Sequence, residues 1–116
     1  MLKRLYIPIL LLMGWSCTHD KGLNPALLAK SGSCDSISYA KHIAPLINAQ
    51  CATVGCHSSG SGNGDFTAYV GVKAKVDNNT FNNRVVVLGD MPPGGALQPD
   101  ELEKVKCWLG KGAPNN

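Results

Sequence analysis

The sequence predicts a small all-α domain that covers residues 34–116 and contains three to four helices. Two segments place apolar side chains at helical spacing: the first runs from Tyr39 to Ile47 and the second from Leu102 to Leu109. The chain of 116 residues has room for one such domain, because its N-terminal part is typical of a targeting sequence. A domain this small buries a modest share of its surface, so a bound cofactor would supplement its hydrophobic core.

The first 16 residues are typical of a signal peptide. A basic start precedes a mostly apolar stretch, residues 5–15, which is too short to span a bilayer permanently. Ser16 and Cys17 follow, and this order resembles the lipobox of bacterial lipoproteins, whose cysteine is lipidated and becomes the mature N-terminus. We therefore expect residues 1–16 to be removed and Cys17 to carry lipid. Ordinary secretion, with Cys17 lost or left free, is the alternative.

Residues 17–33 are predicted to form the lipidated N-terminus and a flexible tether, because glycine, proline, asparagine and serine interrupt any apolar periodicity there. The domain is expected to begin near Cys34. Its first helix is predicted to start after Ser38, a residue suited to capping a helix N-terminus. Pro45 is expected to bend this helix before Cys51. Its apolar stripe consists of Tyr39, Ile43, Leu46 and Ile47.

The most informative stretch is residues 51–57, Cys-Ala-Thr-Val-Gly-Cys-His. A Cys-His pair preceded by a second cysteine is typical of c-type haem attachment, in which each thiol adds across a vinyl group and the histidine ligates the iron. Four residues separate Cys51 from Cys56, whereas two is the common spacing. Residues 52–55 must therefore loop out, which Gly55 would ease. The motif predicts covalent haem on Cys51 and Cys56, with His57 as the proximal iron ligand.

Two other uses of these cysteines stay open. One is half of a zinc site, but zinc requires four protein ligands, and the remaining histidines and cysteines form no second closely spaced pair. The other is a local disulfide between Cys51 and Cys56 beside an incidental histidine. Both alternatives leave His57 without a role at an iron atom.

Between this motif and the last helix, the sequence predicts two loops and one weaker helix. Residues 58–64 and 89–95 are loops rich in glycine. Residues 78–83 are predicted to form a turn, and the apolar run of residues 85–88 is ambiguous. The weaker helix covers residues 66–76, where the side chains expected to share a face are Phe66, Tyr69, Val70 and Val76.

Met91 lies in the second loop, directly before Pro92-Pro93-Gly94-Gly95. A thioether is a soft ligand, and opposite a histidine it raises the reduction potential of haem. No core stripe calls for a methionine in this polar loop, and the prolines would hold it rigidly. The sequence therefore predicts Met91 as the distal axial ligand of the iron.

The last helix is predicted to run from Pro99 to Gly110, with two acidic residues in its first turn that complement the helix dipole. Its apolar stripe consists of Leu102, Val105 and Leu109, with Trp108 at the edge. Cys107 lies nearly opposite Leu109 on this helix, so it faces away from the stripe. It is placed to meet a segment that wraps around the back.

The five cysteines can all be assigned. With Cys17 lipidated and the thiols of Cys51 and Cys56 attached to haem, Cys34 and Cys107 remain. Exported proteins form and keep disulfides. We therefore predict a disulfide between Cys34 and Cys107.

From about residue 37 to residue 116, the sequence resembles the small mono-haem cytochrome c domains of lipoproteins common in Bacteroidetes and related bacteria. The matching residues are Ile43-Ala44-Pro45-Leu46, Cys51 with Gly55-Cys56-His57, Met91-Pro92-Pro93-Gly94-Gly95, and Trp108-Leu109 with the ending Gly112-Ala113-Pro114-Asn115-Asn116. The resemblance implies an all-α, cytochrome c-like fold in which the first and last helices cross and the methionine loop closes the far face of the haem. The four-residue spacing occurs in that family alongside the usual one.

Two further haem contacts are suggested, each with a plain alternative. Arg84 is a candidate partner of a haem propionate, and an exposed arginine is the alternative. Trp108 is a candidate for packing on the porphyrin edge, and a core tryptophan is the alternative. His42 is expected on a helix surface and His19 in the tether.

The expected function is one-electron transfer by a membrane-anchored monomer that meets redox partner proteins on the periplasmic or cell-surface side of a bacterial envelope. The eight carboxylates form no recognisable catalytic pair, so an electron carrier is favoured over an enzyme. A haem peroxidase or a gas or redox sensor with an open distal site is one alternative. A haem-free secreted interaction module, stapled by the Cys51–Cys56 and Cys34–Cys107 disulfides, is the other.

Charge argues against nucleic-acid binding. The net charge of +3 includes Lys3 and Arg4, and removing these with the signal peptide leaves +1. No run of lysine and arginine interleaved with aromatic residues is present. We therefore expect no nucleic-acid partner.

Overall fold

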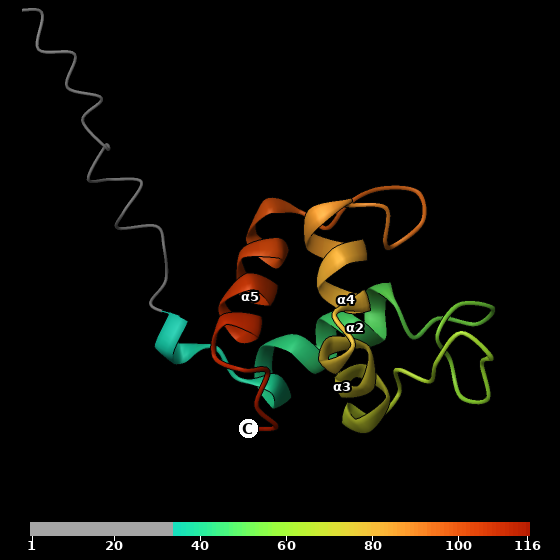
Figure 1. The fold of residues 1–116 in the computed structure, drawn as a ribbon, viewed down its shortest axis with the longest axis horizontal. Coiled ribbons are helices and arrows are strands. Elements are labelled where there is room, and N and C mark those ends of the chain that lie inside the picture. The colour runs from blue at the N-terminus through green and yellow to red at the C-terminus, as the bar shows by residue number, and fades with distance from the viewer. Residues whose placement is uncertain (1–33) are drawn as a thin grey trace, which may run out of the picture. The chain divides into compact units, whose positions relative to one another are not determined.

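The computed structural model describes residues 34–116, and these residues form helices joined by loops, with no strand among them (Figure 1). In chain order the helical elements are the 3-10 turn η1 (Cys34–Ser36), the π-helical turn η2 (Tyr39–Ile43), α2 (Ala44–Gln50), α3 (Tyr69–Asp77), α4 (Thr80–Asn82), the π-helical turn η3 (Asn83–Val87) and α5 (Pro99–Gly110). The predicted all-α class is therefore confirmed for this part of the chain.

The first predicted helix is formed by η2 and α2 together. The Oγ of Ser38 accepts a hydrogen bond from the backbone N–H of Lys41 at 3.4 Å, so Ser38 caps the helix as predicted. Pro45 lies in the first turn of α2, where its missing N–H interrupts no bond within that helix. The predicted apolar stripe is confirmed, because all four of its residues are buried: Tyr39, Ile43, Leu46 and Ile47.

The buried face of α3 differs from the prediction. Val72 is fully buried and Tyr69 and Val76 pack partly buried against the core, whereas Val70 is 74 % exposed. Residues 69, 72 and 76 share one helix face, and residue 70 is rotated away from residue 69 by roughly 100°. The expectation for Val70 was wrong because the alternating Val-Gly-Val pattern fits two faces equally well. Phe66 is buried, but it lies in the loop before the helix.

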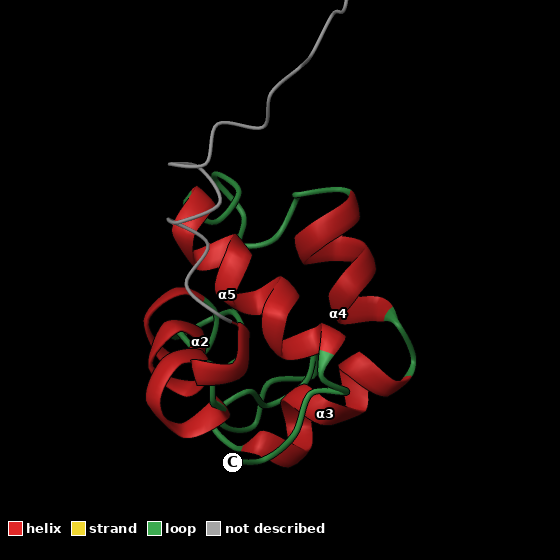
Figure 2. Cartoon of the chain, turned by 90° about the vertical axis from the view of Figure 1, so that its left-hand side faces the viewer, coloured by secondary structure: helices red, strands yellow, loops and turns green. Residues whose placement is uncertain are grey.

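Residues 78–83 form a turn only in part (Figure 2). Asn79 adopts a left-handed conformation with φ of 62°, and α4 begins directly after it and continues into η3. Phe81 and Val85 are spaced i, i+4 on these elements and both are buried. The abundance of asparagine predicted a turn, but two apolar residues one helical turn apart make the segment helical through Val87.

The last helix, α5, has the predicted bounds. The carboxylate of Glu101 accepts a hydrogen bond from the backbone N–H of Gln98 at 3.0 Å, which satisfies a donor at the helix N-terminus. Val105 and Trp108 are fully buried, and Leu102 and Leu109 pack partly buried against the core. Trp108 therefore lies at the centre of the buried face rather than at its edge.

The first and last helices pack together around aromatic rings. The ring centroid of Trp108 lies 5.6 Å from that of Tyr39 and 6.3 Å from that of Phe81. The indole N–H of Trp108 donates to the carbonyl of Pro114 at 2.9 Å, so its polar group has a partner in the interior. Trp108 is thus a core residue, which decides between the two roles considered for it.

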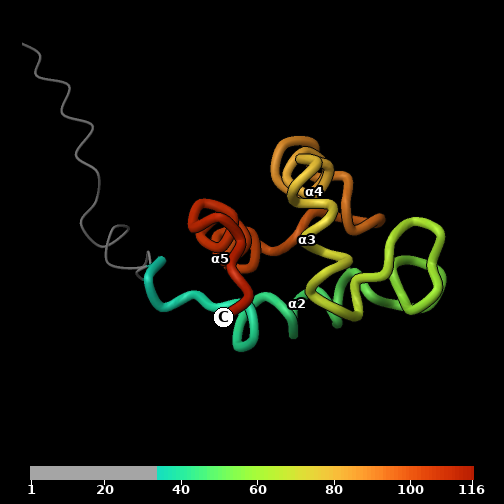
Figure 3. The backbone as a smooth tube through the Cα atoms, turned by 60° about the horizontal axis from the view of Figure 1, so that its bottom comes forward, coloured from blue at the N-terminus to red at the C-terminus, as the bar shows by residue number. Residues whose placement is uncertain are grey.

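The C-terminal residues return to the start of the first helix (Figure 3). The backbone carbonyl of Asn116 accepts from the N–H of Ala40 at 2.8 Å, and its side-chain Oδ1 accepts from the N–H of Tyr39 at 2.9 Å. The hydroxyl of Tyr69 donates to the carbonyl of Ala113 at 2.8 Å. The two bonds to Asn116 give partners to backbone donors that a helix N-terminus otherwise leaves free.

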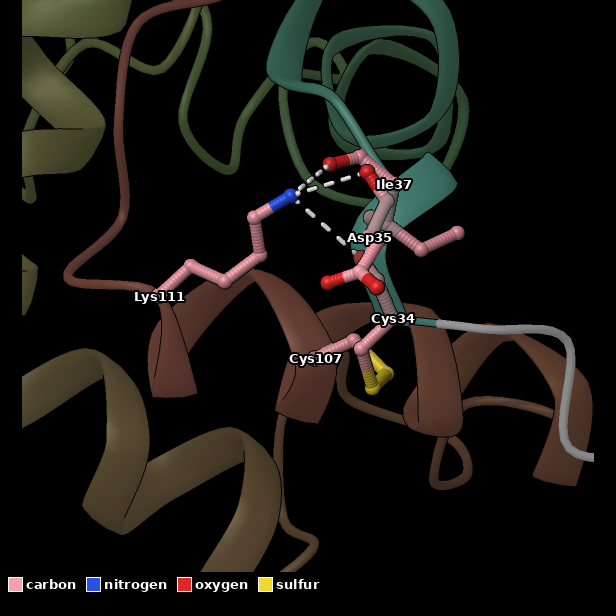
Figure 4. The surroundings of a disulfide bond; sticks show 5 residues. All are labelled: Cys34, Asp35, Ile37, Cys107 and Lys111. Carbon is pink, nitrogen blue, oxygen red and sulfur yellow. Dashed lines mark hydrogen bonds between the residues drawn. A yellow bond between two sulfur atoms is a disulfide. The ribbon is translucent and has the colours of Figure 1, made fainter.

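A disulfide joins Cys34 to Cys107, as predicted, across a sequence separation of 73 residues (Figure 4). The two Cα atoms are 5.1 Å apart, and Cys107 is buried on α5. Beside it, the Nζ of Lys111 donates to three carbonyl oxygens of the N-terminal segment: those of Cys34 at 3.3 Å, Asp35 at 3.2 Å and Ile37 at 2.9 Å. Residues 34–37 are therefore fixed to α5 by the disulfide and by the ammonium group of Lys111.

Three expectations lie outside the described residues: the signal peptide (residues 1–16), lipid on Cys17, and the tether that contains His19 (residues 17–33). Among the helices of residues 34–116, none has both the length and the apolar character needed to cross a membrane.

Candidate functional site

A cavity of about 370 Å³ lies among α2, α3, α4, η3 and two loops. Cys51, Cys56, His57 and Met91, the four residues predicted to hold haem, all line it. Its volume lies within the range of about 300–1,000 Å³ that is typical of small-molecule and cofactor sites. The other lining residues are of two kinds: the apolar residues and glycine are Phe66, Phe81, Val85, Pro92, Pro93 and Gly55, and the polar and charged residues are Gln50, Asn63, Thr80, Lys75 and Arg84.

The two cysteines are presented by a loop that closes on itself directly after α2. Cys51 follows the last residue of α2, and its N–H still donates to the carbonyl of Ile47 at 2.8 Å. The N–H of His57 donates to the carbonyl of Cys51 at 3.1 Å, which brings the two ends of the motif together. The residues between them loop out as predicted, since Val54 is 96 % exposed and Gly55 has a φ of 82°.

Cys51 and Cys56 are both free thiols and both partly buried. The alternative disulfide between them is therefore not formed. Burial raises the pKa of the Cys51 thiol from 9.0 to about 11, with smaller contributions from Cys56 and Glu101. The Cys51 thiol is thus protonated at neutral pH, which makes it a poor nucleophile toward the Cys34–Cys107 disulfide.

His57 is held in one orientation by the loop that follows it. Its Nδ1 lies 3.1 Å from the carbonyl oxygen of Gly64, and because a carbonyl only accepts, Nδ1 carries the proton of this hydrogen bond. The other ring nitrogen, Nε2, then has the free lone pair that a metal ligand needs. The ring stacks on Phe66 with a centroid distance of 4.0 Å and an interplanar angle of 6°.

Gly71 allows this loop to lie against α3. A Cβ atom at Gly71 would be only 1.6 Å from the backbone oxygen of Asp65, so no other residue fits there without moving the loop. The Asp65 carboxylate accepts from the N–H of Thr67 at 2.9 Å and from its hydroxyl at 2.5 Å. These hydrogen bonds, with others from Ser59 and Gly60, lower the pKa of Asp65. The loop is therefore ordered both by its own bonds and by contact with α3.

Met91 comes from the loop between η3 and α5, and it is the single methionine of residues 34–116. It is partly buried, packs against the hydrophobic core, and lines the cavity together with Pro92 and Pro93. Figures 1 and 3 show the other lining loop, between α2 and α3, extending on the side of the domain away from α5. Neither Cys34 nor Cys107 lines the cavity.

Two cations also line the cavity. Arg84 was considered from the sequence, and its Nε donates to Asp90 at 2.7 Å. Lys75, from α3, was missed, because nothing in its local sequence distinguishes it from an exposed lysine. Phe81 and Val85 were also missed as site residues, although their i, i+4 spacing was a usable signal.

The zinc alternative gains no support within residues 34–116. No group of three or more histidine, cysteine, aspartate or glutamate side chains in this part of the chain is arranged to hold a metal ion. His42 lies away from the cavity, and its Nδ1 accepts from the backbone N–H of Ser38 at 3.2 Å. The donor set at the cavity is two thiols, one imidazole and one thioether.

Comparison with protein-family models, with curated proteins and with solved structures finds no match.

Proposed function

We propose that this protein is a c-type cytochrome that carries one electron at a time on a single haem attached to Cys51 and Cys56. One observation supports the proposal most strongly: two free thiols, the histidine next to one of them, and the domain's single methionine line the same cavity. These four side chains come from two loops that are separated in sequence by α3, α4 and η3. Their donor types are those that haem c requires.

Attachment would use the two cysteines in their reduced form. Each thiol adds its sulfur to one carbon of a vinyl group and its hydrogen to the other, so the reaction needs no oxidant. The state of Cys51 and Cys56 suits this chemistry, because both thiols are free. The loop of residues 52–55 absorbs the two extra residues of the motif on the outside of the site.

His57 and Met91 would be the two side chains that hold the haem iron. Bound haem supplies an iron atom that changes between ferrous and ferric states by one electron. The Gly64 carbonyl fixes the proton of His57 on Nδ1, which leaves Nε2 for the iron. The Met91 thioether would favour the ferrous state and so raise the reduction potential. The buried rings of Phe66 and Phe81 exclude water from the site.

As an electron carrier, the protein would be anchored to a bacterial envelope membrane through lipid on Cys17. It would exchange electrons with redox proteins. With His57 and Met91 both as iron ligands, the haem would supply electron transfer rather than a site for a substrate. The chain needs only to hold the haem and expose an edge of it to partners.

A haem peroxidase or gas sensor is the second candidate, and Arg84 is the observation in its favour. Peroxidases place a charged or hydrogen-bonding side chain over the open side of the haem, and Arg84 lines the cavity. Its Nε, however, is engaged by Asp90. This candidate requires Met91 to leave the iron readily, which a spectrum of the oxidised protein detects.

The test is expression of the full chain in cells that carry cytochrome c maturation machinery, followed by pyridine haemochrome and oxidised-state absorption spectra. We expect a c-type haemochrome and a sulfur-to-iron charge-transfer band in the ferric protein. Met91→Ala is expected to keep the haemochrome and lose the band. A colourless wild-type protein would contradict the proposal, and a high-spin ferric spectrum of the wild type would favour the second candidate.

A further inference from the structure

Two hydrogen bonds in opposite directions connect residues 84 and 90. The Nε of Arg84 donates to Oδ1 of Asp90 at 2.7 Å, and the backbone N–H of Asp90 donates to the carbonyl of Arg84 at 3.1 Å. The first is a charge-assisted bond, which is stronger than one between neutral groups. Together they close a short loop whose last residue directly precedes Met91. We call this pair of bonds the Arg84–Asp90 clamp.

The clamp connects Met91 to the hydrophobic core. Arg84 lies on η3, next to the buried Val85, so one end of the clamp is fixed by core packing. Between its two ends, the backbone N–H of Leu88 donates to the carbonyl of Asn83 at 2.9 Å, but Val87 is 66 % and Leu88 is 58 % exposed, so these two side chains add little packing. Gly89 turns the chain with a φ of 63°. Asp90 follows it, and the next residue, Met91, lines the cavity.

Few other hydrogen bonds restrain this loop. Among residues 34–116, the backbone bonds of the stretch after Asp90 are a local one from Gly95 to Pro92 at 3.4 Å and those that begin α5. Leu97 is the next buried side chain along the chain. Between Asp90 and Leu97, the position of Met91 therefore depends on the clamp and on the partial burial of Met91 itself.

From this geometry we infer that Arg84 and Asp90 are positioning residues for the Met91 thioether and set how firmly it is held as an iron ligand. The inference rests on the proposed function and adds a control element to the same site. A neutral thioether is a weak ligand that competes with water and added bases, so a small displacement of its loop changes its occupancy.

The clamp contributes little to the stability of the fold. The side chains of Arg84 and Asp90 are 43 % and 45 % exposed, and exposed ion pairs contribute little to the free energy of folding. A role in positioning therefore has a distinctive signature. Removing the clamp changes the spectrum and the affinity for competing ligands while leaving the unfolding midpoint almost unchanged.

The experiment uses the haem-loaded protein with Asp90→Asn, and with Asp77→Asn as the matched control. Asp77 pairs with Lys73 within α3, so the control removes the same charge from an exposed ion pair that does not line the cavity. Titration with imidazole, monitored by the ferric charge-transfer band, reports displacement of the thioether. We expect Asp90→Asn to bind imidazole roughly fivefold more tightly than wild type, and Asp77→Asn to match the wild type.

Two further variants separate geometry from charge. Arg84→Lys keeps the positive charge but loses the planar Nε donor. Both Arg84→Lys and Arg84→Gln should therefore bind imidazole more tightly than the wild type. The double variant Arg84→Gln/Asp90→Asn should bind imidazole no more tightly than either single variant, because each substitution removes the same interaction. Conversely, if Arg84→Lys retained the wild-type imidazole affinity, charge rather than the hydrogen bond would control the ligand and the clamp would be rejected.

The outcomes distinguish this inference from the proposed function. A wild-type protein without covalent haem, or with haem but no charge-transfer band, would overturn the function or the assignment of Met91, and the clamp with it. A wild type that shows the band, with an unchanged imidazole affinity in Asp90→Asn, would overturn the clamp alone. Equal effects in Asp90→Asn and Asp77→Asn would also overturn it, because the effect would then be one of net charge.

Discussion

On the His57 side of the cavity, residues 51–66 are held by several hydrogen bonds and a ring contact, whereas on the Met91 side little holds the loop of residues 89–95 beyond the Arg84–Asp90 clamp and the partial burial of Met91. The carbonyl of His57 accepts from Phe66 at 2.8 Å, its N–H donates to Cys51, and its ring is both hydrogen-bonded and stacked. Met91 has no comparable set of contacts. The difference indicates that the position of the His57 side chain is fixed more firmly than that of the Met91 side chain.

In the proposed cytochrome, His57 and Met91 would be the two iron ligands, and this contrast would suit their roles. The firmly held histidine would keep the iron in place. The thioether would raise the reduction potential, so a change in its exposed loop would change the potential without disturbing the core. Substitutions on each side show whether the two sides respond independently.

The largest expected effect comes from removing the disulfide, which lies away from both sides. Cys34→Ser/Cys107→Ala should lower the free energy of unfolding by about 4 kcal/mol, because the bond closes a long segment of the unfolded chain. Urea unfolding of the haem-loaded protein measures this. The charge-transfer band should be unchanged, since neither cysteine lines the cavity. A changed band would show that the disulfide and the Met91 side are coupled.

The next effect comes from the contact that holds the His57 side against α3. Gly71→Ala should lower the free energy of unfolding by about 3 kcal/mol, because the new Cβ overlaps the backbone of Asp65 and forces the loop outward. Gly62→Ala is the control, since a Cβ at Gly62 meets no atom within 4 Å. If the two variants unfolded at the same urea concentration, the His57 side would be less firmly packed than the structure indicates.

A smaller effect concerns the pH dependence of the haem-free protein. Burial raises the pKa of the Cys51 thiol from 9.0 to about 11, so folding favours the protonated form. The stability that this contributes is complete below pH 9.0 and is lost as the pH rises toward about 11. Urea unfolding between these pH values should show a steeper decline for the wild type than for Cys51→Ala. Equal slopes would contradict the burial of this thiol.

The same experiment sharpens the account of attachment. Once the Cys51 sulfur is bound in a thioether, it has no proton to lose. The haem-loaded protein should therefore lack the part of the alkaline decline that distinguishes wild type from Cys51→Ala. A haem-loaded protein that kept this part of the decline would contradict attachment at Cys51.

Features with strong local signals could be predicted from the sequence. The bounds of α5 follow from a proline, two acidic residues and a glycine at suitable positions. Its start is stabilised by a hydrogen bond between Gln98 and Glu101, which lie within one helical turn in the sequence. The stripe of the first helix follows from periodicity alone. The Cys34–Cys107 disulfide could be predicted because these are the two cysteines left after the others are assigned, and because Cys107 faces away from the apolar stripe of its helix. Both arguments need only the sequence.

Features that depend on contacts distant in sequence could not be predicted. Val70 and Val72 are equally apolar, and only the packing of α3 on the core decides which is buried. Residues 80–87 are rich in asparagine and valine, and they become helical because Phe81 and Val85 find partners elsewhere in the core. The close approach of Gly71 to Asp65 has no sequence signal, because glycine in a helix usually indicates only flexibility.

The central claim is that Cys51 and Cys56 both carry the same haem next to His57. Its most direct test is mass spectrometry of the peptide that contains residues 51–57, after expression with haem maturation machinery and thiol alkylation under denaturing conditions. We predict a peptide heavier by one haem, with neither cysteine alkylated. Two alkylated cysteines, or a peptide with the mass of an internal disulfide, would contradict the account.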